Sequence, residues 1–508
     1  MFLPAIAQSI GSPHYGGMPR SPQFDNSYRQ LPGRFFSELS ATPVSQPELI
    51  RANPALSATL GIDMEWLVSP EGVEALAGNR VPEGAEPIAT VYAGQQFGNW
   101  VPQLGDGRAI LLGEVIGRDG VRYDVQLKGS GRTPYSRGGD GRAPLGPVLR
   151  EYLVSEAMAA LGVATTRSLA AVTTGERVYR EGALPGAVLT RVAQSHIRIG
   201  TFQYFYSRKD HEGLRLLAGH VIDRHFPQAG GAPNPVRALL DEVVAAQARL
   251  VAQWQALGFI HGVMNTDNML LSGETVDYGP CAFMDDFHPQ RVFSSIDHQG
   301  RYAFGNQPGI AHWNLANLGQ ALLPILDDDG ERARESAQEA IDAFPELFRD
   351  AYREQMARKL GLQGFEEDDD ALVSDFQDLM AGEGADFTLA YRRLADRAQA
   401  GGGQEVGDLF EFPVAFEPWL ERWEQRIGRE DGSPADRQAM MYRANPVFIP
   451  RNHLVAAAIE SAEVEGDLGP FHRLADLLES PPAYGPEFAG FARPPKPEEV
   501  VTQTFCGT

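Results

Sequence analysis

The sequence predicts an α+β fold of two lobes, a smaller strand-rich lobe followed by a larger helix-rich one. Three observations support this fold class. Strand-like runs separated by glycine-containing turns begin at residue 86 and continue to about residue 190. Helical periodicity dominates the chain after residue 190. A loop rich in potential metal ligands, 261–280, directly follows the longest helical segment.

The predicted elements divide the chain into four parts, and all the strand candidates belong to the second. Residues 1–85 form an N-terminal extension rich in proline and glycine, with short helical candidates such as 46–60. Residues 86–190 form the N-terminal lobe, whose one helix, 147–161, has Leu149 and Leu153 on a single face. The strand candidates of this lobe are 88–93, 109–116, 121–127, 168–173 and 187–192.

The second lobe, 191–480, is expected to be mainly helical. Its longest helix candidate, 235–257, is amphipathic and ends at Gly258. The other helix candidates are 313–325, 331–358, 371–380 and 385–398. The C-terminal tail, 481–508, is proline-rich and contains Cys506, and we expect it to be extended on the surface.

Composition and charge exclude several classes of function. The 508 residues carry a formal net charge of −23, which argues against a general nucleic-acid-binding protein because neutralising phosphates requires a basic face. No apolar run approaches the ~18 residues of a membrane span, and the N-terminus lacks the features of a signal peptide. The two cysteines, Cys281 and Cys506, are too few for a disulfide scaffold or a zinc cluster. These features predict a cytoplasmic protein with no nucleic-acid or membrane partner.

The stretch HGVMNTDNMLLSGETVDYGP, residues 261–280, resembles the catalytic and metal-binding loops of protein kinases. In the kinase pattern H-R-D-x-x-x-x-N followed by D-F-G, the first Asp is the base, and the Asn and the second Asp hold metal. His261, Asn268 and Asp277 match this spacing, but Val263 occupies the base position. The chain is therefore either an inactive kinase or an enzyme of different chemistry. The order of the predicted elements favours a protein-kinase-like bilobal fold.

Three residues of this stretch are candidates for the chemistry. Asn268 and Asp277 offer oxygen ligands of the kind that Mg²⁺ accepts while it bridges phosphates. Asp267 could accept the proton of an incoming hydroxyl, although a loop aspartate can equally cap a turn. We expect His261 to brace the loop rather than to act as a base.

Lys128 is the first candidate for phosphate binding. It ends the third strand of the predicted order, where kinases have a phosphate-binding lysine that a helix glutamate holds. Glu151 is the first candidate for that glutamate and Glu156 the second. A surface lysine at a strand end is the alternative interpretation.

Two glycine-containing segments could approach a nucleotide. Gly105-Asp106-Gly107-Arg108 lies in a turn between two strands, where Gly105 and Gly107 permit close approach of phosphate and Arg108 can hold it bidentately. A plain hairpin turn would have the same pattern. The segment 129–147, with its Asp140-Gly141 turn, could close over the nucleotide.

Arg191 and Arg198 could supply further positive charge. They lie seven residues apart, which places them on one face if the segment is helical. An ordinary kinase is apolar in this region because the region lines the adenine pocket. The positive charge, which a triphosphate would need, is therefore in the wrong place for an ordinary kinase.

Together these motifs resemble the SelO family of protein adenylyltransferases (selenoprotein O-like). The matching segments run in order over the first 290 residues: FDNSY, AGQQFGNW, LGDGRAILLGE, DVQLKGSGRTPYSRGGDGRA, REYLVSEAM, TRVAQSHIRIGTFQYF, HGVMNTDNM and DYGP. The similarity extends through WNLANLGQALLPI and MYRANPVFIPRNHL. The resemblance implies a protein-kinase-like fold that binds ATP in an inverted orientation. Such an enzyme transfers AMP to Ser, Thr or Tyr hydroxyls of proteins and releases pyrophosphate.

The resemblance also implies roles for individual residues. Those implied to contact ATP are Gly105, Gly107, Arg108, Lys128, Asp140, Gly141, Arg191, Arg198 and Asp277. Asn268 and Asp277 would hold Mg²⁺, with Mn²⁺ as the alternative ion, and Asp267 would be the proton acceptor. The implied partners are ATP and protein substrates, including the chain itself, and the implied oligomeric state is a monomer.

The same resemblance gives the two cysteines a role. Members of this family often carry a cysteine or selenocysteine near the C-terminus, so we expect a reversible Cys281–Cys506 disulfide that tunes activity by redox state. Two unconnected thiols are the alternative.

Two other functions stay open at this point. One is a phosphotransferase that uses the γ-phosphate of ATP, and Val263 counts against it because such enzymes keep the base aspartate. The other is a catalytically inactive, nucleotide-binding pseudokinase. Asn268 and Asp277 count against that function, because binding alone has less need of both metal ligands.

Overall fold

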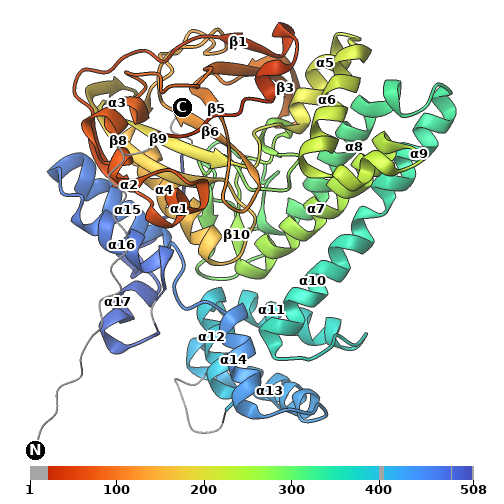
Figure 1. Ribbon diagram of the computed structural model, residues 1–508. Coiled ribbons are helices and arrows are strands. Elements are labelled where there is room, and N and C mark those ends of the chain that lie inside the picture. The colour runs from red at the N-terminus through yellow and green to blue at the C-terminus, as the bar shows by residue number, and fades with distance from the viewer. Residues whose placement is uncertain (1–20, 400–405, 482, 506–508) are drawn as a thin grey trace, which may run out of the picture.

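One large sheet and a body of helices make up the protein, whose computed structural model describes residues 21–399, 406–481 and 483–505. This mixture confirms the α+β class. Figure 1 shows the sheet, coloured red to yellow, beside the green and teal helices that follow it in the chain. The last helices, α15 to α17 (residues 452–492), drawn in the darker blue, return to the sheet side of the molecule.

Among the described residues, nine strands form one sheet in which every pairing is antiparallel. The strand order is β1-β3-β5-β6-β9-β8-β2, while β4 pairs with β3 and β7 pairs with β9. The strands are β1 Phe36–Glu38, β2 Glu48–Ala52, β3 Ile88–Gln96, β4 Asn99–Gly105, β5 Ala109–Ile116, β6 Arg122–Lys128, β7 Ala143–Pro144, β8 Arg167–Tyr179 and β9 Ala183–Ala193. A separate pair, β10 Phe259–Ile260 and β11 Ala282–Phe283, brackets the loop that contains Asp277.

Helix α4, Leu145–Ala160, packs on the sheet and fixes the position of Glu151. Its buried residues Leu149 and Leu153 belong to the same apolar cluster as Leu189 of β9 and Phe471 of α16, Gly469–Glu479. Burial of such side chains contributes about 1.5–3 kcal/mol each. Because both sides of α4 are covered, the helix holds its charged residues at a fixed distance from the strands.

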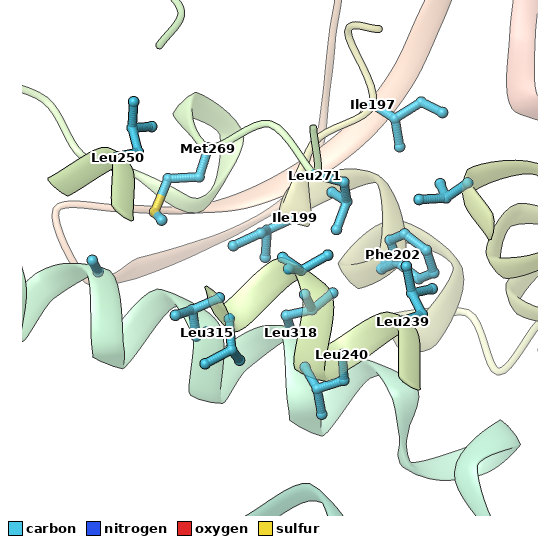
Figure 2. Close-up of a cluster of buried hydrophobic side chains, with 14 of the residues drawn as sticks. Ile197, Ile199, Phe202, Leu239, Leu240, Leu250, Met269, Leu271, Leu315 and Leu318 are labelled. Carbon is cyan, nitrogen blue, oxygen red and sulfur yellow. The ribbon is translucent and has the colours of Figure 1, made fainter. Parts of the chain in front are cut away.

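Helix α7, Pro235–Leu257, is the central helix of the other half, and its bounds are those predicted. Asn234 caps its N-terminus by accepting a hydrogen bond from the amide of Arg237, and Gly258 ends it with a positive φ of 69°. Figure 2 shows Leu239, Leu240 and Leu250 of α7 in one apolar cluster with side chains of other elements. Those labelled are Ile197, Ile199, Phe202, Met269, Leu271, Leu315 and Leu318.

The remaining helices surround these two. Between β2 and β3 in the chain lie α1 Pro54–Leu60, α2 Met64–Leu67 and α3 Pro70–Leu76. Around α7 lie α5 Ile199–Ser207, α6 His211–His225, α8 Gln307–Leu326, α9 Gly330–Asp342 and α10 Phe344–Leu360. The C-terminal part contains α11 Asp369–Glu383, α12 Phe387–Arg397, α13 Pro413–Ile427, α14 Pro434–Ala444, α15 Asn452–Glu460 and α17 Ala489–Ala492.

Two predicted helices differ from the structure. The helical candidate 46–60 is half strand, because 48–52 pairs with β8 as β2 and only 54–60 is helical. The single helix expected over 331–358 is divided at Ala343 into α9 and α10. Pro345, in the first turn of α10, cannot donate the amide hydrogen bond that would continue α9.

The C-terminal tail was expected to be extended on the surface, and part of this expectation is wrong. The tail contains the short helix α17, and Thr504 near its end is 1% exposed. The Thr504 amide donates to the Phe293 carbonyl at 2.7 Å, and its hydroxyl donates to the Pro280 carbonyl at 2.6 Å. These bonds hold the tail against the segment that follows Asp277.

None of the helices in the described ranges has both the length and the apolar composition needed to cross a membrane.

Candidate active site

The residues predicted to bind nucleotide and metal meet in one cavity of about 560 Å³. This volume is within the range of small-molecule sites, about 300–1,000 Å³. Eleven predicted residues line it: Gly105, Gly107, Arg108, Lys128, Asp140, Gly141, Arg191, Arg198, Asp267, Asn268 and Asp277. They come from the sheet, from loops around it and from the loop after α7, so separate parts of the sequence converge here.

A network of buried charges forms one wall of the cavity. The Lys128 ammonium contacts the Glu151 carboxylate, which also accepts from Arg191 Nε at 2.6 Å. Arg191 Nη2 lies 2.7 Å from Asp277 Oδ1, and Arg198 Nη1 lies 2.8 Å from Asp277 Oδ2. Three cations thus face two carboxylates, which leaves a net positive charge beside the cavity.

This network keeps both carboxylates ionised. Burial by itself would raise the pKa of Asp277, but Arg191, Arg198 and Lys128 together hold it well below its usual range. Burial likewise opposes ionisation of Glu151, and Arg191 and Lys128 outweigh it, so the pKa of Glu151 is lowered. The site therefore retains its full charge pattern at neutral pH.

Arg191 and Arg198 converge on Asp277 from a strand and a loop, not from the helix considered for them. Arg191 lies in β9 opposite Gln126 of β6. Arg198 has extended backbone angles, φ −112° and ψ 160°, and directly precedes α5. The sheet continues through Ala193, so strand pairing prevails over the helical spacing. The guanidinium of Arg198 also lies over the Tyr92 ring, 4.8 Å from its centre.

Asp277 has a left-handed backbone conformation, with a φ of 64°. Such a conformation in a residue other than glycine costs on the order of 1–3 kcal/mol and is concentrated at functional sites. The ion pairs with Arg191 and Arg198 hold the carboxylate in place despite this cost.

Asp267 and Asn268 lie in the short 3₁₀ turn Thr266–Asn268. Burial raises the pKa of Asp267 to about 6, with Gln96 and Arg198 opposing the shift. Its Oδ2 accepts from Gln96 Nε2 at 3.2 Å, whereas its Oδ1 has no hydrogen-bond partner among the described residues. Asn268 donates its side-chain amide to the Val263 carbonyl at 2.9 Å, which leaves its amide oxygen to act as a ligand.

The residues that replace or support the kinase motif are buried. Val263, 7% exposed, lines the cavity with an apolar side chain where a kinase has its base. His261 is fully buried, its Nε2 lies 2.8 Å from the Val276 carbonyl, and burial lowers its pKa. His261 therefore links the two ends of the loop as a neutral side chain.

The glycine turn and the loop after Lys128 pack on each other. Gly105 has a φ of 149°, and a Cβ there would lie 2.5 Å from the Tyr135 ring, so the contact requires glycine. The Thr133 hydroxyl donates to the Asp106 carbonyl at 2.7 Å, and the Ser136 hydroxyl donates to the Gly107 carbonyl at 2.5 Å. These bonds hold the glycine turn and the loop together where both line the cavity.

Sequence reasoning missed several cavity residues. Arg180 pairs with both oxygens of Asp140, at 2.9 and 3.0 Å, and this ion pair lowers the pKa of Asp140. Tyr92 and Gln96 of β3 also line the cavity. Gln96 belongs to the motif AGQQFGNW, which is conspicuous in the sequence, but its position beside Asp267 depends on a contact across 171 residues.

Of the two cysteines in the predicted disulfide, only Cys281 lies within the described residues. Cys281 is fully buried, does not line the cavity, and burial raises the pKa of its thiol to about 12. Cys506 lies outside the described residues. Thr504, two positions before it, donates its hydroxyl to the carbonyl of Pro280, the residue that precedes Cys281.

The donor set of the cavity fits a divalent ion bound together with phosphate. Asn268 and Asp277 provide two side-chain oxygens on the same cavity. Mg²⁺ and Mn²⁺ accept such oxygen ligands, and Mg²⁺ typically takes one or two carboxylates with the rest from phosphate and water.

Comparison with known proteins gives consistent results over nearly the whole chain. A family model described as protein adenylyltransferase SelO matches residues 20–479. A protein nucleotidyltransferase YdiU from Rhodopseudomonas palustris strain BisB5 is 59% identical, over 96% of this chain and 99% of the relative. Proteins of the same name from Bradyrhizobium sp. strain BTAi1 and Methylorubrum populi are each 57% identical, again over 96% of this chain and 99% of the relative.

Proposed function

The chain belongs to the SelO family of protein adenylyltransferases and is a nucleotidyltransferase, and from this premise we propose that it transfers AMP from ATP to Ser, Thr or Tyr hydroxyls of proteins. Attack of the hydroxyl oxygen on the α-phosphorus would form the new P–O bond and expel pyrophosphate. The hydroxyl proton would pass to the protein. We also propose a protein-kinase-like bilobal arrangement, with lobes at 86–190 and 191–480, an extension before them and a tail after them.

The single observation that carries the proposal is the position of Arg191 and Arg198. Both guanidinium groups converge on Asp277 inside the cavity, and Arg191 is 2% exposed. An uncharged purine ring gains far less from a buried cationic wall than the charged oxygens of phosphate do. This charge supports a nucleotide whose triphosphate, not its base, enters this end of the cavity, as AMP transfer requires.

The remaining side chains can be assigned roles that fit this orientation. Lys128, Arg191 and Arg198 would neutralise phosphate charge, and Arg108 would hold phosphate oxygens bidentately. The backbone at Gly105, Gly107 and Gly141 would approach the phosphates closely, with Asp140 orienting its loop through Arg180. Such transfer depends on positioning and charge neutralisation more than on covalent chemistry.

Asp267 is proposed as the proton acceptor. A pKa of about 6 leaves it mostly ionised at neutral pH while keeping it basic enough to take a proton. Asn268 and Asp277 would hold Mg²⁺ or Mn²⁺, which would supply charge neutralisation at the phosphates. With Asp267 as the proton acceptor, the enzyme would not need an aspartate at the kinase base position, where Val263 lies.

We further propose that a reversible Cys281–Cys506 disulfide regulates the enzyme. Its formation would remove two hydrogens from the two thiols and pass them to an oxidant such as glutathione disulfide. Support comes from Thr504, whose buried hydroxyl is bonded to the residue before Cys281. The disulfide would attach the tail to the segment directly behind Asp277.

The function is tested by supplying ATP labelled on the α-phosphate and, in parallel, ATP labelled on the γ-phosphate, with Mg²⁺ or Mn²⁺ and a protein acceptor. We expect protein-bound label from the α position alone. Asp277→Ala should abolish it, while Asp350→Ala, a matched change of an exposed aspartate on α10, should not. Label from the γ position would make the protein a kinase, and ATP binding without transfer would make it a pseudokinase.

A further inference from the structure

The turn between β3 and β4 reaches across to the loop that carries Asp267, and we propose that Gln96 in this turn is a positioning residue for the Asp267 carboxylate. This turn segment, residues 95–98, comprises the last two residues of β3 and the two residues that connect it to β4, and it belongs to the AGQQFGNW motif, to which none of the roles above has been assigned. The inference rests on the proposed role of Asp267 as proton acceptor.

Three consecutive residues of the turn bond to three consecutive residues of the loop. The Gln95 amide donates to Thr266 Oγ1 at 2.7 Å, and the Phe97 amide donates to Asn265 Oδ1 at 2.9 Å. Between them, Gln96 Nε2 donates to Asp267 Oδ2 at 3.2 Å. The two bonds from backbone amides fix which residues of the turn lie opposite which residues of the loop. The side chain of Gln96 then bonds directly to the Asp267 carboxylate.

The loop residues that receive the backbone bonds are themselves held from other directions. Thr266 donates its hydroxyl to Gln203 Oε1 of α5 at 2.6 Å. The Tyr302 hydroxyl donates to Asn265 Oδ1 at 2.7 Å, and the Tyr302 ring packs edge-on against Phe97 at 5.1 Å. Asn265 and Thr266 are thus bonded both to the turn and to residues on the other side of the loop. These bonds fix the position of the neighbouring Asp267 relative to the turn.

The backbone of the hairpin is shaped for this contact. Phe97 and Gly98 both have positive φ, 50° and 78°, as a two-residue turn between right-twisted strands requires. A phenylalanine rarely adopts this conformation, and here it aims its amide at Asn265. At Gly94, a Cβ would lie 2.4 Å from Asp267 Oδ1, so only glycine admits the carboxylate so close to β3.

Gln96 therefore controls the orientation of the Asp267 carboxylate. Among the described residues, Oδ1 of Asp267 has no hydrogen-bond partner, and Oδ2 accepts from the side chain of Gln96. Gln96 and Asp267 both line the cavity, so the bond lies at the place where the acceptor hydroxyl must meet the base. Proton transfer requires hydrogen-bond geometry between the base and the hydroxyl. A small displacement of the Asp267 carboxylate would therefore lower the rate of proton transfer substantially.

The test compares wild type with Gln96→Met, which keeps the length of the side chain and removes its amide. We expect kcat for transfer of α-labelled AMP to casein, used as the acceptor probe, to fall about tenfold. The KM for ATP should stay within about twofold, because no group proposed to bind phosphate is changed. Gln103→Met, the same change on exposed β4 of the same hairpin, is the matched control and should match wild type. Gln96→Glu, which places a second carboxylate beside Asp267, should lower kcat further.

The possible results distinguish failure of the positioning role of Gln96 from failure of the proposed function. Equal kcat values for wild type and Gln96→Met, or a rise in KM that accounts for the whole loss, would overturn the positioning role while leaving AMP transfer intact. A wild-type protein that transfers no α-label would overturn the proposed function and this inference with it. Thermal unfolding of both Gln96 variants, expected to match wild type because the side chain is only partly buried, separates misfolding from mispositioning.

Discussion

Individual charged residues of this protein are placed for function at a cost in stability. Asp277 has a strained backbone conformation and forms ion pairs with Arg191 and Arg198. Glu151 is buried and forms ion pairs with Lys128 and Arg191. Desolvation makes buried ion pairs poor stabilisers compared with apolar residues of similar size. Folding alone therefore does not account for this charge pattern, whereas the phosphate binding proposed above would.

Glu274, outside the cavity, gives a prediction about pH. It is 6% exposed and accepts from the Ser272 hydroxyl at 2.7 Å and the Gln194 amide at 3.0 Å, yet burial raises its pKa to about 7 from an ordinary value of 4.5. Between these two values the unfolded chain has lost this proton and the folded chain keeps it. The folded state is therefore destabilised as pH rises through that window, by up to about 3 kcal/mol.

We expect Glu274→Gln to remove this contribution. Melting temperatures of wild type and variant, measured at about pH 5 and about pH 7.5, should show the variant gaining on wild type at the higher pH. The comparison cancels the other groups that titrate in both proteins. A difference between the two proteins that does not change with pH would contradict the assignment.

Among the elements, α7 and β4 show which features are local and which are not. Both ends of α7 are set by adjacent residues, Asn234 and Gly258, and its predicted bounds are confirmed. Strand β4 was not predicted, because its sequence NWVPQLG alternates poorly and contains Pro102. Proline is tolerated there because β4 is bonded to β3 on one side and lies off the main strand order.

The cap of α7 gives a prediction at this scale. Asn234 accepts from the Arg237 amide at 3.0 Å and donates to the Leu326 carbonyl, at the end of α8, at 2.9 Å. Asn234→Ala removes both bonds and should lower the free energy of unfolding by about 1–2 kcal/mol. Asn234→Ser, which keeps an acceptor for the helix amide, should cost less. Equal losses from the two variants in chemical denaturation would show that the cap itself contributes nothing.

Across the whole molecule, distant C-terminal residues support the segment behind Asp277. Arg451 is fully buried and pairs with Asp285 at 2.8 Å and Asp386 at 2.5 Å. Asn452 donates to the Phe283 carbonyl at 2.7 Å, and Thr504 donates to the Pro280 carbonyl. These contacts hold residues 280–286, which directly follow the Asp277 loop, against the C-terminal part of the molecule.

The proposed disulfide is tested on the full chain. After oxidation with glutathione disulfide, we expect the intact mass of wild type to fall by two hydrogens, and reduction to restore it. Cys281→Ser and Cys506→Ser should each prevent this loss. Activity of oxidised wild type should change on reduction, while both variants should be insensitive to reductant. Retention of the full reduced mass in oxidised wild type would refute the pairing.

The sequence by itself determined the family, the α+β class and eleven of the residues that line the cavity. Motifs such as HGVMNTDNM and DYGP carry their chemistry in residue type and spacing, and caps such as Gly258 act on their immediate neighbours. Information of this kind is local, so it can be read along the chain.

Only the tertiary structure decided how these residues are brought together. Arg191 and Arg198 meet at Asp277 from a strand and a loop, and Gln96 meets Asp267 through the turn between β3 and β4. The tail likewise returns to Pro280 from more than two hundred residues away. Such contacts depend on sheet pairing and helix packing between segments far apart in the chain, and no local pattern in one segment records the identity of its distant partner.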